Sequence, residues 1–80
     1  MSKHNVKLYT TPTCVYCRLA KDFFKQNNID YSEVDVAKDR NAAMEMIDKS
    51  GQMGVPVIEV DSKIIIGFDK PALKRALELS

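Results

Sequence analysis

Both cysteines of this 80-residue chain lie in one stretch, Thr11-Pro12-Thr13-Cys14-Val15-Tyr16-Cys17-Arg18. Two residues separate the cysteines, so in a helix their side chains lie one turn apart on the same face. Cα atoms about 5.5 Å apart suit an S–S bond, and such a pair can form a disulfide with little movement of the rest of the chain. The stretch therefore predicts a redox site that passes between dithiol and disulfide.

The residues before Cys14 predict that a helix begins there. Pro12 and Thr13 end the preceding strand, and Thr13 suits the N-cap of a helix that begins at Cys14 or Val15. Unpaired N–H groups and the positive end of the helix dipole favour a thiolate at that position. We therefore expect Cys14 to be the attacking nucleophile, and Cys17, one turn deeper, to be the resolving thiol.

The composition restricts the class of protein. Eighty residues predict a single domain over 1–80, and twelve basic against eleven acidic residues, interspersed along the chain, argue against nucleic acid as a partner. The first residues show no apolar leader, and no apolar run approaches the roughly 18 residues of a membrane span.

We expect a soluble, cytoplasmic protein, in which a close cysteine pair is more often catalytic or metal-binding than structural. With His4 as its one histidine, the chain cannot complete a four-ligand metal site by itself.

The hydrophobic pattern predicts an α/β fold in the order β-α-β-α-β-β-α. Asp39 and Asp69 suit helix N-caps, Gly51 suits a helix C-terminus, and Asp61-Ser62 suits a hairpin turn. A strand-helix-strand unit of this length implies parallel pairing of the first two strands, within a four-stranded mixed sheet flanked by three helices. The expected strands span 6–9, 29–36, 57–60 and 63–66. The expected helices span 14–27 and 39–50, and a last helix begins at Asp69 with Leu73, Ala76 and Leu77 facing inward.

The chain resembles the thioredoxin fold and, more narrowly, a glutaredoxin-like redoxin. The cysteine pair follows the first strand, a Val-Pro pair opens the hairpin, and a Gly-x-Asp precedes the last helix. The resemblance covers almost the whole chain through residues 8–17, 50–57 and 67–69. It implies a thiol–disulfide oxidoreductase that needs no bound cofactor, with glutathione as a reductant, disulfide-containing proteins as substrates and a monomeric state.

The resemblance also implies further site residues. The proline of Val55-Pro56 would be cis and lie beside the cysteines, where the backbone of Val55 receives a peptide-like disulfide substrate. Glutathione would bind at Tyr16, Val55, Pro56 and the Phe68-Asp69 peptide groups, with Asp69 receiving its amino group. Purely structural roles remain open for three of these residues. Tyr16 would then be an exposed aromatic side chain, Phe68 would cover the core, and Asp69 would only cap a helix.

The chain departs from the common glutaredoxin pattern near the cysteines. Thr11 stands where glutaredoxins commonly carry lysine, Gly54 stands where they usually carry threonine, and Val15-Tyr16 stands in place of Pro-Tyr. In the Val15-Tyr16 pair the chain is similar to redoxins that donate hydrogen to ribonucleotide reductase and are reduced by thioredoxin reductase. That role is one alternative. Another is a glutathione-dependent carrier of an iron–sulfur cluster bridged through Cys14, or a redox adaptor.

Three further polar residues are interpreted as surface groups. Arg18 and Lys21 are expected to be solvated on the first helix, with Arg18 able to stabilise a nearby thiolate. His4 is expected to be exposed and without a role.

Overall fold

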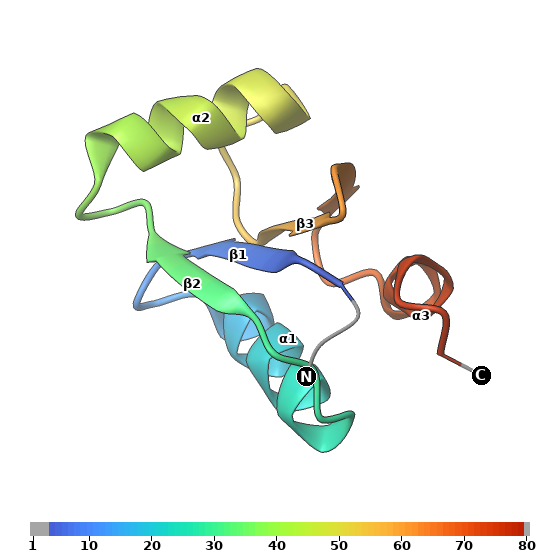
Figure 1. The fold of residues 1–80 in the computed structure, drawn as a ribbon. Coiled ribbons are helices and arrows are strands. Elements are labelled where there is room, and N and C mark those ends of the chain that lie inside the picture. The colour runs from blue at the N-terminus through green and yellow to red at the C-terminus, as the bar shows by residue number, and fades with distance from the viewer. Residues whose placement is uncertain (1–3, 80) are drawn as a thin grey trace.

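The computed structural model describes residues 4–79 and has the expected element order. Its elements are β1 (Val6–Thr10), α1 (Val15–Gln26), β2 (Ser32–Asp35), α2 (Arg40–Ser50), β3 (Val57–Val60), β4 (Lys63–Ile66) and α3 (Lys70–Ala76). The strands form one four-stranded sheet in the order β2-β1-β3-β4, in which only the β1–β2 pair is parallel. Figure 1 shows α2 over one face of the sheet and α1 and α3 over the other. The predicted thioredoxin/glutaredoxin-like fold is confirmed.

The larger part of the core lies between the sheet and the pair α1 and α3. Side chains alternate along β1, so that Val6, Leu8 and Thr10 share the face opposite Lys7 and Tyr9. Val6 and Leu8 join a buried cluster to which α1, the hairpin and α3 also contribute, with Ala20, Phe23, Phe24, Ile58, Val60, Ile65, Leu73 and Leu77. Because Ile65 of β4 and Leu73 of α3 belong to this cluster, the last helix covers one face of the hairpin.

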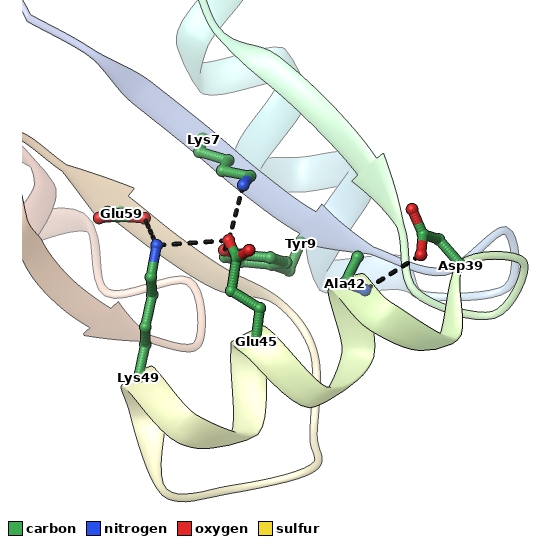
Figure 2. Close-up of polar contacts among 7 residues, drawn as sticks. All are labelled: Lys7, Tyr9, Asp39, Ala42, Glu45, Lys49 and Glu59. Atoms are coloured by element: carbon green, nitrogen blue, oxygen red, sulfur yellow. Dashed lines mark hydrogen bonds and ion pairs between the residues drawn. The ribbon is translucent and has the colours of Figure 1, made fainter.

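The other face of the sheet is covered by α2. Tyr9, Met46 and Val57 form a small buried cluster there. Above it, the Glu45 Oε1 accepts hydrogen bonds from the Tyr9 hydroxyl at 2.5 Å and the Lys7 Nζ at 2.8 Å, and Lys49 links Glu45 to Glu59 of β3 (Figure 2). This polar network joins α2 to both central strands. Nothing in the spacing of these residues along the sequence predicted it.

The helix ends follow from local chemistry. Asp39 and Asp69 cap α2 and α3 by accepting the N–H of Ala42 and Ala72, at 3.1 Å and 3.2 Å. Gly51 ends α2 with a φ of 75°, a left-handed conformation that glycine adopts readily. All three positions match the predictions. None of the helices within residues 4–79 is long and apolar enough to cross a membrane.

Some sequence-based expectations were wrong in detail. The second strand is Ser32–Asp35 rather than 29–36, because Ile29 ends the preceding turn by donating its N–H to the Phe24 carbonyl at 2.8 Å. On α2 the buried residues are Ala42 and Met46, and Ala43 and Ile47 are half-buried, although helical spacing places them beside Met46.

The prediction for His4 was also wrong. Its ring is largely covered, and its Nδ1 contacts the carboxylate of Asp61, while its Nε2 lies 3.4 Å from Glu78. It therefore contacts the hairpin turn and the residues after α3.

Candidate active site

The fold brings three separate segments to the same end of the sheet. Tyr9 pairs with Val57 and Val57 pairs with Ile66, so the C-terminal ends of β1 and β4 lie beside the N-terminal end of β3. The cysteine loop leaves β1 at this end, Val55-Pro56 enters β3 there, and residues 67–69 leave β4 there. The segments predicted to form one site therefore meet in space.

Cys14 is itself the N-cap residue of α1, so the prediction that Thr13 caps this helix was wrong. Its backbone is extended, with φ −87° and ψ 114°, and its Sγ accepts the backbone N–H of Cys17 at 3.1 Å. Sulfur thus takes the place that a serine or aspartate oxygen usually takes at an N-cap. The sulfur thus receives a backbone N–H donor at the N-terminal end of α1. Because Cys14 is partly exposed, a disulfide substrate can reach it.

Cys17 lies one turn inside α1 and is 1% exposed. Both cysteines are free thiols in this structure. Burial raises the pKa of the Cys17 thiol and hydrogen bonding to Cys14 raises it further, whereas hydrogen bonds from the Thr10 side chain and the Thr11 backbone lower it. The Cys14 sulfur is therefore partly exposed and the Cys17 sulfur is buried behind it, and their roles as attacking and resolving thiols stay predictions.

The Val55-Pro56 peptide bond is cis, as the resemblance implied. Pro56 is buried at the start of β3, and its carbonyl accepts the N–H of Gly67 at 2.9 Å. This bond ties the segment before β3 to the segment before α3. Val55 is partly exposed beside it.

The remaining predicted residues differ in exposure. Tyr16 is 63% exposed on the first turn of α1, and the neighbouring Val15 is also exposed. Phe68 is partly buried and packs edge-on against Phe23, with ring centroids 6.0 Å apart, so it covers the core. Asp69 is exposed and caps α3. Binding roles for these residues stay predictions.

Two basic residues of α1, Arg18 and Lys21, differ in their surroundings. Arg18 is exposed, as expected for a solvated side chain. Lys21 instead forms an ion pair with Glu33 of β2, which raises the pKa of its ammonium group. Within residues 4–79, no group of three or more His, Cys, Asp or Glu side chains is placed to hold a metal ion.

Two residues near the site were missed by the sequence analysis. Met53, in the loop before Val55, is 79% exposed, although methionine is usually read as core or loop filling. Thr10, the last residue of β1, is 2% exposed and lies beside the cysteine loop. The burial of Thr10 could have been predicted from its position in the strand. It lies two residues after Leu8, so its side chain is on the same face, which α1 covers.

Comparison with known proteins agrees with this geometry. Residues 6–65 match the Glutaredoxin family. The chain belongs to the glutaredoxin family. It is 40% identical to glutaredoxin 3 of Escherichia coli strain K12 over 67 residues, which cover 81% of this chain and 78% of that protein.

Other relatives share the small size of this glutaredoxin-family chain. A glutaredoxin-like 8.6 kDa protein of Clostridium pasteurianum, from a rubredoxin operon, is 44% identical over 73 residues, which cover 91% of this chain and 97% of the relative. The crystal structure of the thioredoxin-like protein BC3987 superposes with a TM-score of 0.86 at 32% identity, over 91% of this chain and 100% of that one. Family and fold together support thiol–disulfide oxidoreductase chemistry at Cys14 and Cys17.

Proposed function

We propose that this protein is a glutaredoxin-like electron carrier that reduces protein disulfides or glutathione mixed disulfides with its Cys14-Cys17 dithiol. The Cys14 thiolate attacks one substrate sulfur, forms a mixed disulfide and releases the other substrate sulfur as a thiolate, which takes a proton from solvent. Cys17 then loses its proton and attacks the Cys14 Sγ. The second substrate sulfur leaves with the electron pair, and an external donor later reduces the Cys14–Cys17 disulfide.

The contrast between the two sulfurs carries this proposal. The Cys14 Sγ is accessible and receives the Cys17 N–H at the start of α1, whereas the Cys17 side chain is buried behind it. A substrate can therefore reach Cys14 and not Cys17. The order of attack and resolution follows from this difference in access.

The surface near the site favours a protein as the disulfide substrate. Val15, Tyr16 and Met53 present exposed apolar side chains close to the cysteine and Val55-Pro56 segments. Thr11 leaves the site without the lysine that glutaredoxins commonly use for a glutathione carboxylate. Glutathione stays part of the proposal as the donor, with Tyr16, the Val55 backbone and Asp69 as its contacts. The proposal includes a monomeric protein in the cytoplasm with no bound cofactor.

A second candidate is a hydrogen donor to ribonucleotide reductase that thioredoxin reductase reduces. The Val15-Tyr16 pair supports it, because that pair is the feature in which the chain is similar to such donors. The chemistry at the two sulfurs is the same in both candidates. They differ in the electron donor and in the protein that receives the electrons.

One experiment tests the function and separates the candidates. The oxidised protein is mixed with NADPH and either glutathione plus glutathione reductase or thioredoxin reductase, and reduction of insulin and of hydroxyethyl disulfide is followed by NADPH consumption. Turnover with glutathione supports the first candidate, and turnover with thioredoxin reductase alone supports the second. No turnover with either donor and either substrate would refute both.

A further inference from the structure

The loop between α2 and β3 carries the most exposed large apolar side chain among residues 4–79, that of Met53, which is 79% exposed. Of the other methionines in this range, Met44 is 60% exposed and Met46 is 1% exposed, both on α2. We propose that the Met53 thioether is an oxidation site, and that its sulfoxide weakens the docking of protein disulfides at the cysteines. This inference rests on the dithiol function proposed above and adds a way to regulate it.

Hydrogen bonds on both sides of Met53 fix the loop with this side chain outside. The Ser50 hydroxyl donates to the Met46 carbonyl at 2.6 Å and accepts the Gln52 N–H at 3.2 Å. The Gln52 side-chain amide donates past Met53 to the Gly54 carbonyl at 3.4 Å. Because these bonds join the residues before and after Met53, the exposure of its thioether follows from the folded loop.

The loop carries Met53 toward the cysteine end of the sheet. Met53 lies two residues before Val55, in the segment that enters β3 at that end. Gly54 between them has no side chain, and a Cβ placed there would meet only Gln52 within 4 Å. A protein whose disulfide reaches Cys14 and the Val55 backbone would therefore also cover the Met53 side chain. The apolar contact made there would add to the affinity.

Hydrogen peroxide is the oxidant that this site would take. The Met53 sulfur attacks one peroxide oxygen with a lone pair, and the O–O bond breaks. The hydroxide that leaves takes the proton of the transferred oxygen and becomes water. Methionine is thus oxidised by two electrons to the sulfoxide, and peroxide is reduced by two electrons. No other reactant is needed.

The sulfoxide changes what a protein substrate meets at this position. A thioether is apolar and can be buried without losing a strong hydrogen bond, whereas a sulfoxide oxygen loses its bonds to water when a partner covers it. A small disulfide that contacts Cys14 alone leaves Met53 in water. Oxidation of Met53 should therefore slow the reduction of proteins and spare small disulfides, and methionine sulfoxide reductase can reverse it.

The test oxidises methionine while both cysteines are protected. The protein is held as the Cys14–Cys17 disulfide and treated with hydrogen peroxide for increasing times. Catalase then removes the peroxide, and peptide masses report the sulfoxide at Met44, Met46 and Met53. The disulfide is next reduced with dithiothreitol, and the dithiothreitol is removed. Loss of the two protein thiols is followed by mass after mixing with insulin or with hydroxyethyl disulfide.

Two leucine variants separate Met53 from the other exposed methionine. In the wild type we expect Met53 to be oxidised first and Met46 to stay intact. The rate constant for insulin should then fall about fivefold, the effect of leaving one polar group without a partner in an interface. The rate constant for hydroxyethyl disulfide should not change. Met44→Leu should respond to peroxide like the wild type, whereas peroxide should leave the insulin rate of Met53→Leu at its value before treatment.

Several outcomes would overturn the inference. Oxidation of Met44 ahead of Met53 would contradict the assigned site. An insulin rate that survives oxidation of Met53, or an equal loss with hydroxyethyl disulfide, would contradict the effect on docking. If the untreated protein reduces neither disulfide, the dithiol function itself fails, whereas a Met53 that resists oxidation overturns this inference and leaves that function intact.

Discussion

The Sγ of Cys14 accepts the backbone N–H of Cys17 at 3.1 Å, so the sulfur proposed to attack the substrate is held by the residue proposed to displace it. The contact also makes Cys14 the N-cap of α1. Because a cap residue adopts extended backbone, the Cys14 side chain lies outside the first turn, where a substrate can approach. Capping and nucleophilic attack thus depend on one position of one sulfur.

The hydrogen bonds of Glu45 predict a loss of stability in acid. Its bond with Lys7, followed by those with Tyr9 and Lys49, lowers the pKa of the carboxyl to about 2. An unfolded glutamate titrates near 4.3, so this contribution is complete above about pH 5 and is lost as the pH falls toward 2. Glu45→Gln should therefore flatten the decline of the free energy of unfolding between pH 5 and roughly pH 2.

Urea unfolding across this pH range provides the measurement. Asp48→Asn is the matched control, because Asp48 is an exposed carboxylate on the same helix. It should show the wild-type pH dependence. An equal flattening in both variants would mean that net charge, and not the network of Figure 2, sets the acid response.

Gly51 predicts a cost for any side chain at the end of α2. Its φ is 75°, and a Cβ placed there meets no atom within 4 Å, so the cost of Gly51→Ala is backbone strain alone. We expect a loss of about 1 kcal/mol in the free energy of unfolding. Gly54→Ala is the matched control, since no left-handed φ is required there and its Cβ would make ordinary contact with Gln52 at 3.7 Å. Similar losses at the two positions would contradict this explanation.

Asp69 has a capping role that can be separated from a role in binding. Asp69→Ala removes the bond to the Ala72 N–H and should lower the stability by about 1 kcal/mol. Asp69→Asn should keep that stability, because asparagine caps a helix as well as aspartate does. If the carboxylate receives the glutathione amino group, Asp69→Asn should raise the KM for glutathione at unchanged kcat. An unchanged KM would leave Asp69 as a cap alone.

Signals local in the sequence predicted most of the fold. Asp39, Gly51 and Asp69 act within a few residues of themselves, so their capping roles could be recognised from spacing. The parallel β1–β2 pair and the hairpin followed in the same way from element length and turn residues. The cysteine spacing indicated the chemistry because the reacting groups lie within one helical turn.

Contacts between distant segments were not predictable in the same way. Glu45 appeared as one more polar residue on α2, yet it is bonded to Lys7 and Tyr9 of β1. His4 appeared idle, although it contacts Asp61 and Glu78. Thr13 was the better N-cap by residue type, and only the backbone conformation places Cys14 there. In each case the partner depends on how the elements pack.

The most direct test of the assigned roles is to trap the mixed disulfide. Reduced Cys17→Ser and Cys14→Ser proteins are each incubated with glutathione disulfide and with a disulfide-bonded peptide, and their intact masses are measured without reductant. We predict a stable adduct on Cys14 in the Cys17→Ser protein and none in the Cys14→Ser protein. An adduct on Cys17, or a Cys14→Ser protein that still reduces disulfides at the wild-type rate, would contradict it.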